Sequence, residues 1–281
     1  MGFGCNACGV IGCRIIDSPR ERLIAILTNN FVPCNGRFPT LIAIITMFFS
    51  GVIALPYRSF ISAVILTGVI ILGIIMTLLV SKILSKTILK GLPSSFTLEL
   101  PPYRRPQFGK VIVRSIFDRT LFVLGRAIAV AAPAGLLIWV LSNIMINNIS
   151  VLSYCSEFLD PFAKLLGLDG VILMAFILGF PANEIVIPII IMSYLCTGAL
   201  TDFSSLEELR LLLTQHGWTW LTAICTMLFS LMHFPCGTTC WTINKETRSL
   251  KWTVIAFVLP TIVGMVICFC IASFSRLIGI A

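Results

Sequence analysis

The sequence has 281 residues, of which 58% are hydrophobic and 11% are charged, and its mean hydropathy is +1.02. Average soluble proteins carry about 25% charged residues, so this composition excludes a water-soluble domain with a polar shell. The formal net charge is +8, but the basic residues gather between long apolar runs, which is typical of membrane topology. We therefore expect the lipid bilayer as a partner and no nucleic acid.

Eleven cysteines are spread along the chain. Because no cleavable signal sequence precedes them, we expect their thiols to stay largely reduced in a cytoplasmic membrane protein, without a disulfide scaffold. Most of them are interpreted as small packing residues in apolar runs.

The first predicted helix follows a Gly- and Cys-rich stretch at the N-terminus. Ser18 and Glu21 have the spacing of a capping box, with Pro19 at the first helical position. This pattern predicts a short amphipathic helix over about residues 19–29.

Apolar runs of spanning length come next. About 20 apolar residues in a helix cross a hydrocarbon core that is about 30 Å thick. We predict spanning helices over residues 39–55, 60–80, 126–146, 218–234 and 252–274. The first two, which a Pro-Tyr-Arg break separates, are predicted to form a helical hairpin.

A basic loop separates the second and third runs. Residues 82–119 contain eight lysines and arginines against Glu99 and Asp118, and this excess predicts the cytoplasmic side of the membrane. Two successive prolines in this loop remove backbone donors and predict an extended elbow over residues 100–103. The more acidic residues 147–170 are assigned to the outer side.

Residues 171–195 form a further apolar run that is interrupted at its centre. Glu184 lies near the predicted middle of the bilayer, where a carboxylate is costly unless it faces a polar cavity or a cation. Pro181 removes the helical donor for the carbonyl group of Ile177, which leaves a backbone oxygen beside the amide of Asn183. We predict a broken helix with a cation site, and a buried ion pair or hydrogen bond to another helix is the alternative.

The charge distribution also bears on topology. If every run crossed the bilayer, the basic residues of 245–251 would face outward, against the positive-inside tendency. We therefore hypothesise that residues 171–195 form a re-entrant hairpin, which places 245–251 inside and Glu207 outside. Ser204 and Glu207 form a second capping box and predict a polar helix that ends near His216.

Thiol and imidazole groups supply further candidate ligands. Cys5 and Cys8 form a CxxC pair, Cys236 and Cys240 share one face if their segment is helical, and His233 lies three residues before Cys236. Thiolate and imidazole favour Fe(II), Zn(II) or Cu(I) over Mg and Ca. Packing is the alternative for each thiol, and a membrane redox protein that uses the Cys5 and Cys8 pair is another.

Enzymatic motifs are missing from the sequence. There is no GxxxxGK[ST] phosphate loop, HExxH or GxSxG pattern, and the NKET run at residues 244–247 lacks the aspartate of a guanine-reading motif. We expect no nucleotide hydrolysis and no other enzymatic activity from this chain.

Five stretches carry a family resemblance. They are GFGCN at residues 2–6, PC and RFP within 33–39, ELPPYR at 99–104, GFPANEI at 179–185 and HFPC at 233–236. With these stretches in this order, the sequence resembles the FeoB family of ferrous iron transporters. The resemblance implies an all-α, polytopic membrane bundle with broken or re-entrant gate helices, which imports Fe2+ across the bacterial cytoplasmic membrane. It implies Fe2+ as the transported ion and no stably bound cofactor.

The resemblance also assigns candidate residues to the Fe2+ pathway. Carried over by position, they are Cys5, Cys34, Asn183, Glu184 and Cys236. Weaker candidates, which rest on residue type and spacing, are Cys8, His233 and Cys240. Ala7 and Cys8 stand where the family often has Val-Pro, a departure that adds a thiol and removes a helix-breaking proline.

Family members carry a GTP-binding domain, a helical regulatory domain and further spans before the region that this sequence matches. We therefore expect a fragment or one half of a split transporter, with an N-terminal FeoB half that contains the GTP-binding domain as its partner. The resemblance also implies a small FeoA-type accessory protein as a possible partner.

These expectations divide the chain into five regions. They are the first gate motif with an amphipathic interfacial helix (1–38), a transmembrane hairpin (39–81), a cytoplasmic basic loop with an amphipathic helix (82–125), a transmembrane helix with the second gate (126–200, with the broken helix at 171–198), and a C-terminal part with two transmembrane helices (201–281).

A second functional class stays open. Broken helices of this kind also occur in nucleoside-recognition or gate-type membrane modules, as in spore maturation proteins, which do not transport iron. A nucleoside site would favour aromatic and amide side chains at the positions where this sequence has Cys5, Cys34 and Cys236.

Overall fold

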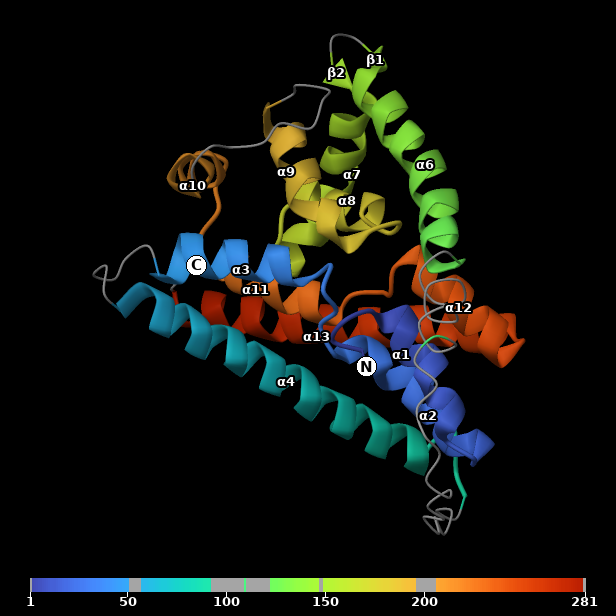
Figure 1. The fold of residues 1–281 in the computed structure, drawn as a ribbon. Helices are drawn as coiled ribbons and strands as arrows, with labels where there is room; N and C mark the ends of the chain where they lie inside the picture. The colour runs from blue at the N-terminus through green and yellow to red at the C-terminus, as the bar shows by residue number, and fades with distance from the viewer. Residues whose placement is uncertain are drawn as a thin grey trace.

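The computed structural model describes residues 2–50, 57–91, 109, 122–146, 149–195 and 206–279. The chain is a helical bundle (Figure 1). Its helices are α1 (Asn6–Gly12), α2 (Pro19–Thr28), α3 (Phe38–Ile44), α4 (Arg58–Lys86), α6 (Phe122–Asn143), α7 (Val151–Leu165), α8 (Gly170–Leu178), α9 (Val186–Leu195), α10 (Leu206–Gln215), α11 (Trp220–Met232), α12 (Gly237–Thr247) and α13 (Leu250–Ile278). Two-residue strands, β1 (Met145–Ile146) and β2 (Ile149–Ser150), pair antiparallel after α6. The predicted all-α fold class is confirmed.

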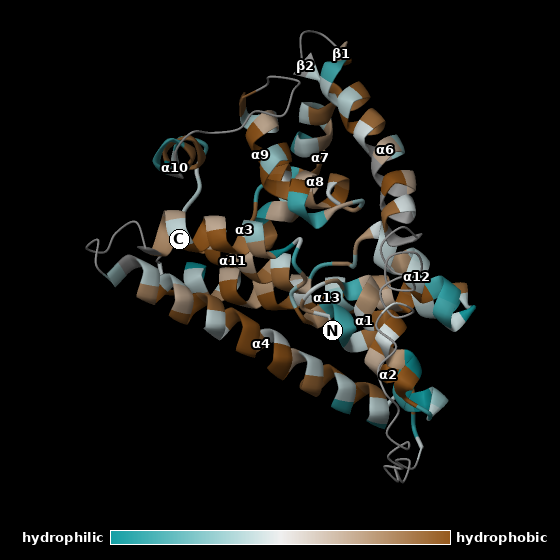
Figure 2. Cartoon of the chain, in the orientation of Figure 1, coloured by the Kyte–Doolittle hydropathy of each residue, from teal (hydrophilic) through white to brown (hydrophobic). Residues whose placement is uncertain are grey.

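Several helices are suited to a bilayer. In the described segments, Ser59–Lys86, Trp220–Thr247 and Leu250–Ile278 are long and apolar enough to cross it, and the α7–α8 pair, bent by 109°, would be a fourth span if it crosses as one unit. Helix α4 is apolar along most of its length (Figure 2), and many of its large apolar side chains are exposed. A helix that is apolar on all sides fits a lipid environment, and the chain is a multi-pass membrane protein.

The helices form two groups. Helix α4 runs along one side of the molecule beside α2, α3 and α11, whereas α7, α8 and α9 form a compact group on the opposite side (Figure 1). Helix α12 packs against α1, α13 and α6. The core therefore lies where α11 meets α3, α4 and α13.

Local sequence signals set several helix ends. The hydroxyl group of Ser18 accepts a hydrogen bond of 3.4 Å from the backbone N–H of Glu21, and Pro19 begins α2, as the capping box predicts. Asp169 and Thr219 cap α8 and α11 in the same way. The helix predicted at residues 19–29 is confirmed as Pro19–Thr28.

Residues 147–170 differ from the expectation of a simple outer stretch. They contain α7, which begins after the cap Ser150 and buries Leu152, Ser156 and Ala163 on the face that meets α8. Helix α7 is not a long apolar run in the sequence, because its other face is exposed and carries charged residues.

The predicted break in residues 171–195 is confirmed, with one correction. Helix α8 ends at Leu178, a 3-10 turn spans Asn183–Ile185, and α9 begins at Val186. The carbonyl group of Ile177 is not free, because it accepts the N–H of Phe180 at 3.2 Å. The chain tightens into a shorter turn at this helix end and satisfies the oxygen that Pro181 leaves without its helical donor.

Some expectations concern residues that the structure does not describe. The elbow at 100–103, Ser204, Cys196 and most of the basic loop at 82–119 lie outside the described residues. The five-region division and the re-entrant hairpin stay predictions.

Candidate functional site

Four interruptions between helices meet in the bundle. They are residues 2–5 before α1, 29–37 between α2 and α3, 179–185 between α8 and α9, and 233–236 between α11 and α12; together we call them the break region. The N–H of Asn35 donates to the carbonyl oxygen of Gly4 at 3.2 Å, and the N–H of Gly237 donates to that of Phe180 at 2.7 Å. Backbone groups that would continue a helix thus join one break to another.

Three predicted thiols come together here. Cys34 is 8% exposed, and its sulfur lies 3.9 Å from Nδ2 of Asn183. Cys236 lies within electrostatic range of both Cys34 and Cys5, and its sulfur is 3.2 Å from the hydroxyl oxygen of Thr239. Thiols from three separate breaks therefore lie in one region of the bundle.

His233 lies at the middle of this arrangement and is 1% exposed. Its Nδ1 is 2.9 Å from the carbonyl oxygen of Ser230 and 3.2 Å from that of Phe229. Because a carbonyl oxygen only accepts, Nδ1 carries the proton and Nε2 has a lone pair.

The amide of Asn183 connects His233 to Cys34. Nε2 of His233 is 3.3 Å from Oδ1 of Asn183. The orientation of a side-chain amide is assigned from its neighbours. An amide turned so that Nδ2 donates to the lone pair of His233 directs Oδ1 at the thiol of Cys34, and this arrangement satisfies all three groups.

Aromatic rings enclose His233. The ring centroids of Phe176, Phe234 and Phe229 lie 5.0, 5.2 and 6.1 Å from the imidazole centroid. Rings at these distances keep water away from the imidazole and strengthen its polar contacts.

A buried polar network extends the site toward the N-terminus. Nδ2 of Asn6 donates to Oδ1 of Asn30 at 3.1 Å, and Nδ2 of Asn30 donates to the carbonyl oxygen of His233 at 2.6 Å. Oδ1 of Asn6 and Oγ1 of Thr40 are buried without a hydrogen-bond partner among the described residues. Each is an oxygen atom that a ligand could engage.

Sequence reasoning missed three members of this network. Asn6, Asn30 and Arg37 are buried. Asn6 and Arg37 belong to the stretches that carry the family resemblance, whereas Asn30 lies outside them. The available signal was the occurrence of amide and guanidinium side chains in an otherwise apolar context, which requires a buried partner for each.

The other predicted residues lie around the site or apart from it. Glu184 is exposed, adjacent to the buried Asn183. The predicted shared face requires both thiols on one helix, but Cys236 has an extended backbone and precedes α12 as its N-cap. Cys240 lies on α12, and its thiol donates to the carbonyl oxygen of Pro235 at 3.6 Å. Cys8 is partly buried in α1. Among the described residues, no three His, Cys, Asp or Glu side chains form a group that could hold a metal ion.

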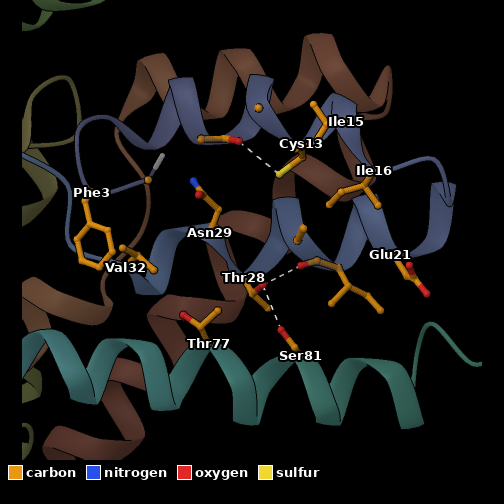
Figure 3. A pocket seen from close by; sticks show the side chains of 15 residues that line it. Phe3, Cys13, Ile15, Ile16, Glu21, Thr28, Asn29, Val32, Thr77 and Ser81 are labelled. Carbon is orange, nitrogen blue, oxygen red and sulfur yellow. Dashed lines mark hydrogen bonds between the residues drawn. The ribbon is translucent and has the colours of Figure 1, made fainter. Parts of the chain in front are cut away.

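A groove of about 540 Å³ lies between α1, α2 and α4 and adjoins the break region (Figure 3). Gly2, Gly9 and Gly12 line one wall, and Asn29, Thr28 and Ser81 line the other. Burial raises the pKa of the Cys13 thiol, which therefore stays protonated and donates to the carbonyl oxygen of Gly9 at 3.3 Å.

Comparison with known proteins gives two family matches. Residues 124–250 match the family model described as Gate, nucleoside recognition, and residues 66–118 match the one described as Ferrous iron transport protein B C terminus. No solved structure matches the chain.

Curated relatives match nearly the whole chain. The Fe(2+) transporter FeoB of Staphylococcus aureus (strain MSSA476) is 32% identical over 96% of this chain and 39% of the relative. That of Methanocaldococcus jannaschii is 27% identical over 99% of this chain and 41% of the relative. An Fe(2+) transport protein A/Fe(2+) transporter FeoB fusion protein of Porphyromonas gingivalis (strain W83) is 24% identical over 96% of this chain and 36% of the relative. The chain thus spans about two fifths of the length of these relatives.

Fold and site together define a class: a multi-pass helical membrane protein whose polar centre is built from interrupted helices. The matches then identify the family. The chain belongs to the FeoB family and corresponds to the C-terminal membrane portion of its members.

Proposed function

We propose that this chain is the C-terminal permease portion of an Fe2+ importer and that the ion passes through the break region. The observation that carries the proposal is the buried bridge from Cys34 through Asn183 to His233, which joins three separate breaks. The relatives named as Fe(2+) transporters support it.

The donor atoms suit this ion. Thiol sulfur, imidazole nitrogen and amide oxygen bind borderline metals such as Fe2+ better than Mg2+ or Ca2+. The thiols of Cys5, Cys34 and Cys236 come from different breaks, so a movement of one break relative to another changes which donors the ion meets. Fe2+ is the cargo in this proposal, and no stably bound cofactor is required.

Glu184 has a distinct role in the proposal. Its carboxylate is exposed beside the buried amide of Asn183, so it would attract a hydrated cation and deliver it to the thiols. Cys8, Cys240 and the imidazole of His233 would act as secondary ligands.

The proposed setting follows from the family. The membrane would be the bacterial cytoplasmic membrane, and the working transporter would include an N-terminal FeoB half with a GTP-binding domain. The fusion relative from Porphyromonas gingivalis, whose name joins transport protein A to FeoB, supports a FeoA-type partner. The proposal assigns no catalytic step to this chain.

Uptake of Fe2+ in anaerobic cells that lack their own ferrous transporter tests the proposal. The full chain is expressed with and without the N-terminal half of a relative. We expect uptake only with both, and a loss of at least about tenfold with Cys34→Ser or Glu184→Gln. Cys270→Ser, at an exposed thiol on α13 outside the break region, is the matched control and should leave uptake unchanged. Absent uptake from an expressed, membrane-inserted pair would exclude the proposal.

A nucleoside module is the second candidate, because residues 124–250 match a model described as nucleoside recognition. The same cells should then accumulate a radiolabelled nucleoside rather than iron. Nucleoside accumulation that Cys34→Ser leaves unchanged would favour this candidate.

A further inference from the structure

Arg37 is a fully buried arginine without a carboxylate partner. Its side chain is 0% exposed, and no ion pair involves it among the described residues. Burying a guanidinium group is costly unless its charge and its donors are satisfied. Neutral oxygen atoms supply that compensation at the two terminal nitrogens, whereas Nε has no hydrogen-bond partner among the described residues.

Five oxygen atoms surround the two terminal nitrogens. Nη1 donates to the carbonyl oxygens of Asn30 at 2.8 Å and of Leu231 at 2.7 Å. Nη2 donates to Oδ1 of Asn30 at 3.1 Å and to the carbonyl oxygens of His233 at 3.0 Å and Phe234 at 3.3 Å. We call these five atoms the oxygen cage.

The sequence explains why these oxygens are available. Pro235 has no N–H, so the carbonyl group of Leu231 lacks its helical donor. In a continuous helix the N–H of Gly237 would donate to the carbonyl oxygen of His233, but here it donates to the carbonyl oxygen of Phe180 in the α8–α9 break. The cage therefore exists because α11 and α12 are interrupted and because a second break captures one of their donors.

An oxygen cage of this kind has the chemistry of a cation site. Carbonyl and amide oxygens are the groups that replace the hydration shell of an alkali or alkaline-earth ion in proteins and channels. Here a guanidinium fork fills it, and its planar shape reaches several acceptors at once in a way that a lysine ammonium does not.

We propose that Arg37 is a tethered cation that occupies the oxygen cage, locks the α2–α3 break to the α11–α12 break, and closes the cage to free cations. Occupation of the cage by Arg37 and the resulting link between the two breaks require no assumption about transport. With the cage closed, the transported ion binds the thiol and amide groups of the break region instead; this consequence rests on the proposed function.

Chemical rescue tests the occupied cage directly. Arg37→Ala removes the atoms that ethylguanidinium would replace, so the purified full chain should melt at a lower temperature than the parent. Millimolar ethylguanidinium chloride should then raise the Tm of Arg37→Ala by several degrees more than ethylammonium chloride does. It should not raise the Tm of the parent chain or of Arg14→Ala, whose arginine pairs with Glu246 at the surface.

Two further variants keep the test decisive if Arg37→Ala does not fold. Arg37→Lys keeps one charge but offers a single ammonium to five oxygens, so its Tm should fall between those of the parent and Arg37→Met. A Tm of Arg37→Met equal to that of the parent, or the absence of specific rescue in a folded Arg37→Ala, would overturn the proposal. No iron is present in these measurements, so their failure is separate from a failure of the transport proposal.

Discussion

At the scale of single residues, Asn183 connects the site. Its amide lies within hydrogen-bonding distance of both the imidazole of His233 and the thiol of Cys34. Because it is buried, its partners have no water to replace it. Asn183 thus links the stability of the break region to the position of two candidate ligands.

Asn183→Ala should therefore lower both stability and uptake. The change leaves the Nε2 lone pair and the thiol without a partner, which costs about 1–3 kcal/mol for buried polar groups. Thermal unfolding of the purified chain and Fe2+ uptake with the N-terminal half are the measurements. Asn143→Ala, at an exposed amide on α6, is the control, and equal effects of the two substitutions would contradict the assigned role.

At the scale of elements, the α7–α8 corner depends on close backbone approach. A Cβ atom on Gly170 would lie 1.9 Å from the carbonyl oxygen of Ser156. This contact allows the two helices to meet at 109° and so directs α8 toward the break region. Only a residue without a side chain fits this position.

Gly170→Ala should destabilise the protein by more than about 3 kcal/mol, because the clash is with backbone and requires the helices to separate. Gly68→Ala on α4 is the control, since no atom lies within 4 Å of its added Cβ. It should be neutral or stabilising by up to about 1 kcal/mol. Denaturant unfolding in detergent measures both, and similar losses at the two positions would count against the close contact.

At the scale of the whole molecule, the orientation in the bilayer connects charge to topology. Helix α10 carries Glu207 in its first turn, and the turn between α12 and α13 is basic. The positive-inside tendency places that turn in the cytoplasm. On this hypothesis, the interrupted helices α8 and α9 form a re-entrant hairpin, which enters and returns without a full crossing.

Cysteine labelling in intact cells tests this orientation. Glu207→Cys should react with a membrane-impermeant maleimide from outside, whereas Lys251→Cys should react only after the cells are permeabilised. The parent chain, with its native thiols, gives the background, and site-resolved mass spectrometry assigns each adduct. Labelling of both positions from outside would exclude the re-entrant hairpin.

The sequence by itself determined the membrane class, the cap of α2 and the interruption near Glu184. Each of these depends on residues a few positions apart, because caps, prolines and apolar runs act on their own segment. Family stretches added the pathway residues, which stay a proposal.

Only the tertiary structure decided which of these residues meet. Packing of helices distant in sequence places Cys34, Asn183 and His233 together and leaves Glu184 exposed. It also buries Arg37 against carbonyl groups that are left available by Pro235 and by the N–H of Gly237, which donates to Phe180. Such contacts join positions nearly 200 residues apart, and no local pattern encodes a distance of that kind.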